Sequence, residues 1–135
     1  MRRLVALTAF ATILSAAACG DSPTEASGSV VGTWHLQTVD GSPPPFTLLE
    51  LTGYRLEVMG GVLIMNSNDT YANTYTYRET ENGTVTTVQE TDIGTYIQSG
   101  STIFLEDDEG FQAQATFSGN QLTFIESGFT VRYSR

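Results

Sequence analysis

The stretch Val30-Val31-Gly32-Thr33-Trp34-His35-Leu36-Gln37-Thr38-Val39-Asp40 decides how the rest of the chain folds. Apolar and polar residues alternate along it, as they do in a β-strand that buries one face. Trp34 is the only tryptophan of the chain and one of the largest side chains available to nucleate a core. We therefore expect the first strand of an all-β barrel here, with Trp34 closing one end of the barrel.

After residue 53 the sequence repeats one theme, a short run of apolar and β-branched residues followed by a turn. The turns contain Gly, Asn, Asp and Ser, which tolerate the tight backbone of a hairpin. The predicted strands cover residues 54–59, 62–66, 70–80, 84–98, 102–106, 111–117, 121–126 and 129–134. Strands of about six residues at this spacing predict an antiparallel up-and-down meander of eight or nine strands. Such a sheet leaves exposed edges unless it closes, so we predict a closed all-β barrel over residues 30–135.

Four short segments of the predicted barrel lead to separate predictions. Gly60-Gly61 suits the positive φ of a tight hairpin turn, and Gly94 is expected at a bulge or bend of a long strand. Pro43-Pro44-Pro45 cannot donate backbone hydrogen bonds, so it predicts a stiff loop at the rim of the barrel. Residues 46–51 are largely apolar and are expected to form a short helix or a cap over the barrel mouth.

Residues 1–18 have the layout of a bacterial export signal. Met1-Arg2-Arg3 is a basic head, residues 4–14 are an apolar run, and small residues then lead to Cys19. The apolar run is too short to be a stable transmembrane helix. Residues 20–29 are small, polar and without periodicity, which predicts a flexible tether between Cys19 and the folded domain.

The sequence Ala16-Ala17-Ala18-Cys19 resembles the lipobox of bacterial lipoproteins. The resemblance implies that Cys19 is lipidated and becomes the first residue of the mature chain, so that acyl chains anchor the protein to a membrane. Lipoproteins retained at the inner membrane tend to carry Asp after the cysteine. Here that residue is Gly20, so the resemblance implies the outer membrane, facing the periplasm. Two alternatives remain open, ordinary signal-peptidase cleavage after Ala18 and a buried structural thiol at Cys19.

The chain is strongly acidic, with 15 Asp and Glu against 6 Lys and Arg and a formal net charge of −9. Loss of Arg2 and Arg3 with the signal would remove two cations and no acid, which takes the charge from −9 to −11. Such a charge repels nucleic acid and anionic lipid headgroups, so we expect no nucleic-acid partner. It favours solubility or a cationic partner.

Gly32-Thr33-Trp34, about eight further strands and an arginine in the last strand together resemble lipocalin-like domains over residues 30–135. The resemblance implies an up-and-down barrel in which Gly32 and Trp34 lie at the closed end and an arginine packs across the indole. Arg132 is the closest match to that arginine, and Arg135 is the second. We expect a monomer.

The sequence offers few groups for catalysis or metal binding. His35 is the only histidine and points to the face of its strand opposite Trp34, so it cannot build a multi-histidine zinc site. The chain contains no nucleophile-elbow, phosphate-loop or metalloprotease motif, and we predict a non-enzymatic protein without a cofactor. The acidic run Glu106-Asp107-Asp108-Glu109 is a candidate calcium site without EF-hand spacing. A plain hairpin turn whose acids face water explains this run more simply.

An eight-stranded barrel is either filled by side chains or holds one small ligand. Strands of about six residues make a shallow barrel, so we expect a small pocket at most. The candidate ligand-binding residues are Phe46, Tyr75, Tyr77 and Tyr96. The leading hypothesis is a lipid-anchored envelope protein that binds a small apolar molecule at the barrel mouth. The alternatives are a protein-binding module, such as a periplasmic protease inhibitor acting through residues 20–29, and a purely structural envelope lipoprotein.

Overall fold

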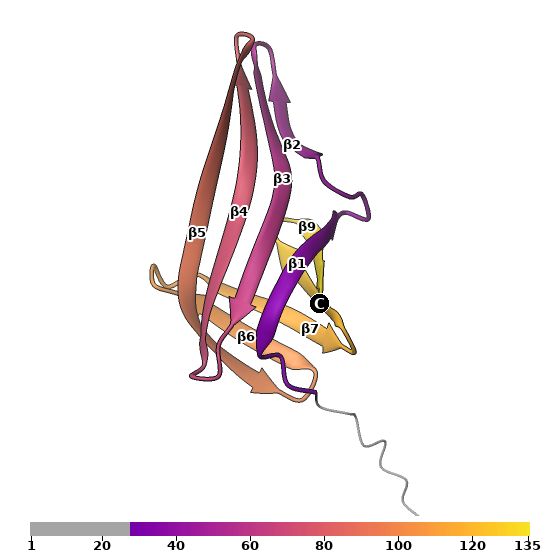
Figure 1. Ribbon diagram of the computed structural model, residues 1–135, viewed down its shortest axis with the longest axis vertical. Helices are drawn as coiled ribbons and strands as arrows, with labels where there is room; N and C mark the ends of the chain where they lie inside the picture. Colours follow the sequence, from indigo (N-terminus) through magenta and orange to yellow (C-terminus); the bar gives the residue numbers. More distant parts are fainter. Residues whose placement is uncertain (1–27) are drawn as a thin grey trace, which may run out of the picture.

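The computed structural model describes residues 28–135, so the predictions for the export signal, for Cys19 and for most of the tether lie outside the described residues. The described chain folds into antiparallel β-strands that form one continuous sheet (Figure 1). The strands are β1 (Gly32–Val39), β2 (Phe46–Leu51), β3 (Tyr54–Met65), β4 (Thr70–Glu81), β5 (Thr84–Ser99), β6 (Thr102–Asp107), β7 (Gln112–Ser118), β8 (Gln121–Glu126) and β9 (Phe129–Ser134).

The sheet closes on itself. Its strands follow the order β1-β9-β8-β7-β6-β5-β4-β3-β2, and residues 32–35 of β1 also pair with residues 62–65 of β3. In the described part of the chain, eight strands therefore make a closed antiparallel barrel, and β2 is one extra strand beside β3. Alternating residues such as Ala115 and Phe117 of β7 point into the barrel and are buried. The predicted all-β meander that closes into a barrel is confirmed.

Three strands are longer than the others, and the first of them, β3, joins the two strands predicted over residues 54–59 and 62–66. β3 and β4 have 12 residues each and β5 has 16. β1 pairs with β3 only at residues 62–65, and β6 pairs with β5 only from Gly94 onward, so the outer parts of these strands leave the barrel. With β2 they form a four-stranded sheet that rises beyond the barrel (Figure 1). We call it the distal sheet; it consists of β2 and residues 54–58, 76–81 and 84–92.

Gly60 and Gly61 lie inside β3, and the predicted hairpin turn at these residues is wrong. They pair with Thr76 and Tyr75 of β4, and a bulge between Val58 and Gly60 shifts the register. A Cβ on Gly61 would lie 3.1 Å from the Tyr75 ring. The missing side chain of Gly61 therefore makes room for a tyrosine of the neighbouring strand and does not serve a turn.

Residues 46–51 form strand β2, so the predicted short helix or cap is wrong. The pairing runs from Phe46 with Val58 to Leu51 with Tyr54, which leaves Thr52 and Gly53 as the turn. Gly53 has a φ of 79°, a conformation that glycine adopts without strain. This two-residue hairpin turn joins the apolar run to β3 and keeps it from folding over the barrel mouth.

Gly94 lies where β6 begins to pair with β5. A Cβ at this position would lie 2.1 Å from the Glu106 carbonyl oxygen and 2.7 Å from the Asp107 Cα, so a larger residue fits only if β6 moves. The pairing of β5 with both of its neighbours is regular across Gly94, so the expected bulge is not formed. The glycine instead permits the close approach of β6 at the point where the outer part of β5 leaves the barrel.

Trp34 is fully buried near the barrel end at which β1 begins. Its Nε1 donates a hydrogen bond to the Val30 carbonyl oxygen at 2.8 Å, and the Phe117 ring meets the indole edge-on. The Arg135 guanidinium lies 4.5 Å from the centre of the indole ring. The arginine that packs across Trp34 is therefore Arg135, the second candidate, and not Arg132.

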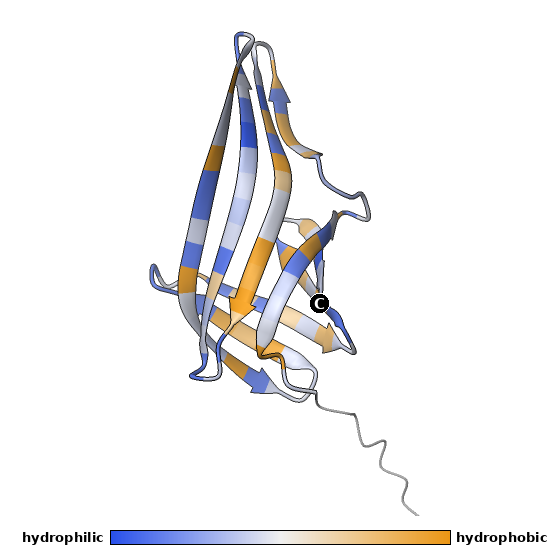
Figure 2. Cartoon of the chain, viewed as in Figure 1, coloured by the Kyte–Doolittle hydropathy of each residue, from blue (hydrophilic) through white to orange (hydrophobic). Residues whose placement is uncertain are grey.

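Arg132 alternates in β9 with the buried residues Val131 and Tyr133, so its side chain points away from the barrel core. Gly32 has a φ of 144°, which favours glycine, and it lies close to the Arg135 side chain. Figure 2 shows an apolar segment of β3 (orange) in the part that pairs with β1. The closed end of the barrel, around Trp34, is thus a packed core.

Candidate functional site

The barrel contains a cavity of about 430 Å³, which we call the mouth cavity. Inward-facing residues of β3 to β9 line it, and its inner wall includes the buried side chains Leu63, Leu105 and Phe124. It reaches the surface at the barrel end formed by residues 107–111 and 126–129, which we call the mouth. Small-molecule sites have volumes of about 300–1,000 Å³, so the mouth cavity is large enough for a ligand.

A smaller hollow of about 190 Å³ adjoins the mouth cavity on the inner face of the distal sheet, and we call it the side hollow. Its lining is mainly apolar and includes Val39, Leu48, Val58, Tyr77, Phe129 and Val131. Tyr75, Glu126 and Ser127 line both the mouth cavity and the side hollow. The two spaces therefore meet at Tyr75 and Glu126.

Two buried tyrosines carry hydroxyl groups that are held in place by hydrogen bonds. Tyr75 donates to Glu126 Oε2 at 3.0 Å, and Tyr133 donates to Asn73 Oδ1 at 3.1 Å. Burial raises the pKa of both tyrosines above the ordinary value of a phenol. Both phenols stay protonated at neutral pH, so they act as fixed hydrogen-bond donors and not as bases.

Glu126 is the last residue of β8 and lies between the mouth cavity and the side hollow. Glu126 as a whole residue is exposed. Partial desolvation of its carboxylate raises its pKa, and the negative charge of Asp92 raises the pKa further. The hydrogen bond from Tyr75 lowers the pKa and offsets part of this rise. The charge of Glu126 is therefore poorly compensated by its surroundings.

The four predicted ligand-binding residues do not form one site. Tyr75 lines both spaces and Tyr77 lines the side hollow, with the two ring centroids 5.8 Å apart. Phe46 packs edge-on against Phe129 at the border of the side hollow, with centroids 5.8 Å apart. Tyr96 lines neither space, and its hydroxyl donates to a backbone oxygen at 2.7 Å. The structure thus brings Tyr75 and Tyr77 together, with Phe46 nearby, and leaves Tyr96 apart.

Sequence reasoning missed several residues of the mouth cavity. Tyr71 and Asn73 share a face of β4 with Tyr75 because they occupy alternate positions, so the period-two pattern of residues 70–80 could have identified them. Burial raises the pKa of Tyr71 to about 12. Asp92 and Glu126 carry no comparable signal, because each looks like an ordinary acid of a strand exposed to water.

The acidic run at residues 106–109 forms the end of β6 and the following turn. Asp107 Oδ1 accepts hydrogen bonds from the backbone N–H groups of Glu109, at 3.0 Å, and Phe111, at 2.8 Å. One carboxylate of the run thus holds the turn, and Asp107 and Glu109 also line the mouth cavity. Within residues 28–135, no group of three or more His, Cys, Asp or Glu side chains is placed to hold a metal ion.

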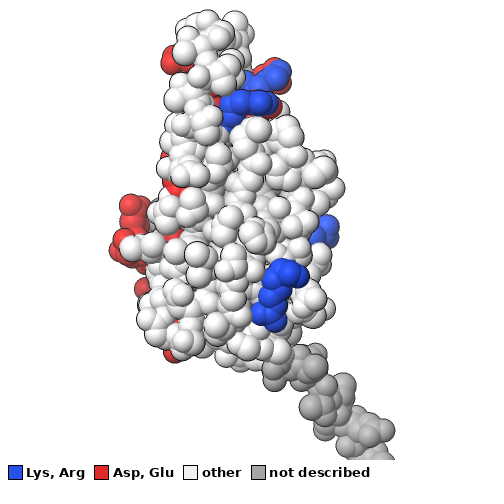
Figure 3. All heavy atoms as spheres, viewed as in Figure 1, with Lys and Arg blue, Asp and Glu red and all other residues white. Residues whose placement is uncertain are grey.

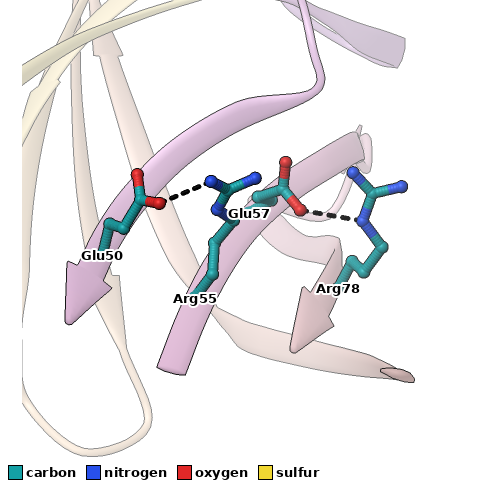
Figure 4. A network of polar contacts seen from close by, with 4 residues as sticks. All are labelled: Glu50, Arg55, Glu57 and Arg78. Carbon is teal, nitrogen blue, oxygen red and sulfur yellow. Dashed lines mark hydrogen bonds and ion pairs between the residues drawn. The ribbon is translucent and has the colours of Figure 1, made fainter. Parts of the chain in front are cut away.

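The arginines of the distal sheet lie on its outer face, opposite the side hollow. Arg78 Nε donates to Glu57 Oε2 at 2.8 Å, and Arg55 pairs with Glu50 (Figure 4). The hydrogen bond from Arg78 holds the pKa of Glu57 below its ordinary value. Figure 3 shows arginines next to acids near the top of the view and a separate group of carboxylates along the left side.

His35 is exposed on β1, away from the mouth cavity. The part of the chain that the structure describes has no helix of the length and apolarity needed to cross a membrane.

Compared with known protein families, with curated proteins and with solved structures, the chain matches none of them.

Proposed function

We propose that the protein is a non-enzymatic, lipid-anchored protein of the cell envelope that binds a small, largely apolar molecule in the mouth cavity. The observation that carries the proposal is the cavity itself, about 430 Å³ inside a closed barrel, with buried apolar and aromatic side chains and several polar residues in its lining. Sites of this kind commonly bind small molecules through apolar contacts and a few placed polar groups. Tyr75 and Tyr133 are such polar groups.

The resemblance to lipocalin-like domains supports the same proposal. It rests on the closed meander of eight strands, on Gly32 and Trp34 at the closed end, and on Arg135 across the indole. A ligand would enter at the opposite end, where Phe111 and Ile125 line the mouth cavity with exposed fractions of 71% and 74%. Exposed apolar side chains at an opening favour the entry of an apolar molecule.

Binding without catalysis agrees with the chemistry of the lining residues. Acid–base catalysis needs a group that reaches the substrate and can exchange a proton near the working pH. Tyr75 and Tyr133 keep their protons, because burial raises the pKa of both. Apart from the tyrosines, the titratable groups of the lining are carboxylates, and no His or Arg of residues 28–135 lines the mouth cavity beside them.

The envelope location is proposed from Ala16-Ala17-Ala18-Cys19. Acyl chains on Cys19 would contribute about 0.8 kcal/mol for each buried methylene, so two or three chains suffice for stable anchoring. The described chain enters the barrel at the closed end. An anchor at Cys19 would then leave the mouth accessible, on an outer membrane with the domain in the periplasm.

Native mass spectrometry of the full chain, extracted from the membrane of its host, tests the anchor. We expect the mass of a mature chain that begins at Cys19 and carries acyl chains. Cys19→Ala should abolish this mass and release the protein into the soluble fraction. An unmodified chain that is cleaved after Ala18 would overturn the proposed anchor and leave ligand binding to be judged separately.

The same measurement tests ligand binding through a small molecule that copurifies with the protein. Ala113→Trp places a large side chain in the mouth cavity and should abolish copurification. Gln114→Trp is the matched control, because Gln114 is the next residue of β7 and is exposed on the outer face. Wild-type protein that carries no molecule and also ignores lipophilic probes would refute the proposed ligand site.

A further inference from the structure

The charged side chains that line the mouth cavity are all carboxylates. Asp92 comes from β5, Asp107 from β6, Glu109 from the following turn and Glu126 from β8. No Arg or His of residues 28–135 lines the cavity, and the chain has no lysine. A ligand in the mouth cavity therefore meets negative charge on several sides.

These carboxylates have no cationic partner in the described part of the chain. Its ion pairs use Glu50 and Glu57, on the outer face of the distal sheet. Arg135 lies over Trp34 at the closed end. The charges of Asp92 and Glu126 repel each other, and this contributes to the raised pKa of Glu126. A positive group of the ligand would supply the compensation that the chain itself does not.

The uncharged lining suits a cation with an apolar part. Tyr71, Tyr75 and Phe124 line the mouth cavity, and the faces of aromatic rings attract cations. From Tyr75 and Glu126 the side hollow continues between apolar side chains such as Leu48 and Val58. Negative charge therefore lies at the junction of the two spaces, and an apolar surface extends from it.

We propose that the ligand of the mouth cavity is an amphipathic organic cation, an ammonium group attached to an apolar body. The ammonium group lies near Asp92 and Glu126 and against the ring of Tyr75, and the apolar body lies in the side hollow. This inference rests on the proposed function, because it names the class of molecule that the mouth cavity binds.

Other classes of ligand fit these residues less well. The carboxylates come from separate elements, and within residues 28–135 no three of them are placed to coordinate one metal ion. An anion would be repelled by every charged group of the lining. A neutral apolar molecule would bury carboxylates that have no cationic partner, which is costly. An ammonium group matches both the carboxylates and the aromatic rings.

Three probes with the same apolar body test the class of ligand. They are the cation 4-phenylbutylamine, the neutral 4-phenylbutan-1-ol and the anion 5-phenylpentanoate. Each is titrated by calorimetry into the full chain held in phosphatidylcholine nanodiscs, with protein-free discs as the blank. We expect the amine to bind at least about tenfold more tightly than the alcohol, and the acid to show no binding.

Variants then locate the charge that selects the amine. Glu126→Gln and Asp92→Asn should each weaken amine binding by about fivefold to twentyfold and leave binding of the alcohol unchanged. Glu81→Gln is the matched control, because Glu81 is the last residue of β4 and lies outside the mouth cavity. It removes the same charge and should keep the amine affinity within about twofold.

The outcomes separate this inference from the proposed function. An alcohol that binds as tightly as the amine, with binding lost in Ala113→Trp, would refute the cationic ligand and keep the ligand site. Failure of all three probes to bind at millimolar concentration would refute the site and the inference with it. Equal losses of amine affinity in Glu81→Gln and Glu126→Gln would also refute the inference, because they would trace to the overall charge of the protein.

Discussion

Tyr75 donates a hydrogen bond to Glu126 over 3.0 Å, although the two residues lie 51 positions apart and on strands β4 and β8, which are not neighbours in the sheet. The bond joins two sides of the mouth cavity just below the distal sheet. Tyr75 is 5% exposed, so its side of the bond is shielded from water. One hydrogen bond thus joins β4, just below the distal sheet, to the carboxylate of Glu126 on β8.

Tyr75→Phe removes this hydroxyl and leaves the ring. We expect a loss of about 1 kcal/mol in the free energy of unfolding, as is typical for one hydrogen bond. The pKa of Glu126 should rise further, because the bond from Tyr75 lowers it. Urea unfolding measures the first effect, and NMR titration of the Glu126 carboxyl carbon measures the second. Tyr96→Phe, which removes a hydroxyl bonded to the Asn66 backbone oxygen, should leave the Glu126 pKa unchanged.

Glu126→Gln should change how stability depends on pH. The pKa of Glu126 is raised above 4.5 in the folded state, so its contribution to stability is fully present below the unfolded pKa and is lost as the pH rises through the folded pKa. The amide still accepts the bond from Tyr75 and carries no charge. We expect the variant to be more stable than the wild type at pH 7, by no more than about 1 kcal/mol because the site is partly open to water, and similar at about pH 4. Urea unfolding at both pH values would show an equal difference if this account is wrong.

Glu57 should respond to pH in the opposite direction. The hydrogen bond from Arg78 holds its pKa below the ordinary value, so its contribution is present above the unfolded pKa and is lost as the pH falls through the folded pKa. Glu57→Gln should therefore destabilise the protein at pH 7 and have little effect near pH 2. Glu50→Gln is the control, since the side chains of Glu50 and Arg55 are 60% and 47% exposed and should contribute less. Thermal unfolding of both variants across this range measures the difference.

The closed barrel could be predicted because its signals are local. Alternation in residues 111–117 and 129–134 shows which residues face inward, and a meander with two open edges favours closure. The length of β3 could not be predicted, because Gly60-Gly61 has the same composition as a hairpin turn. Only the pairing with Thr76 and Tyr75 shows that the strand continues through both glycines.

The candidate site could be predicted only in part. Tyr75 and Tyr77 follow from the alternating aromatic residues of β4, whereas the meeting of Tyr75 with Glu126 depends on barrel closure, which no local pattern contains. For the arginine that packs against Trp34, in contrast, the local pattern contains the relevant information. Alternation in β9 places Arg132 opposite the buried Val131, so the pattern itself disfavours Arg132.

Gly94→Ala tests the close approach of β6 to β5. The added Cβ would lie 2.1 Å from the Glu106 carbonyl oxygen, so we expect a loss of about 2 kcal/mol or more in the free energy of unfolding. Gly60→Ala is the matched control, because a Cβ there meets no atom within 4 Å. It should change stability by less than about 0.5 kcal/mol. Chemical denaturation of both variants measures the difference, and similar losses would show that the close approach at Gly94 is not the cause.

Arg135→Met tests the arginine at the closed end of the barrel. The substitution keeps an apolar chain of similar length and removes the guanidinium, which lies 4.5 Å from the centre of the Trp34 ring. We expect a loss of about 1 kcal/mol in the free energy of unfolding and a shift in tryptophan emission. Arg132→Met, on the outward face of β9, should change stability by less than about 0.5 kcal/mol and leave the emission unchanged. Because Trp34 is the only tryptophan, the emission reports on this end of the barrel alone. A shift of the emission in Arg132→Met without one in Arg135→Met would indicate that Arg132, and not Arg135, packs against the indole.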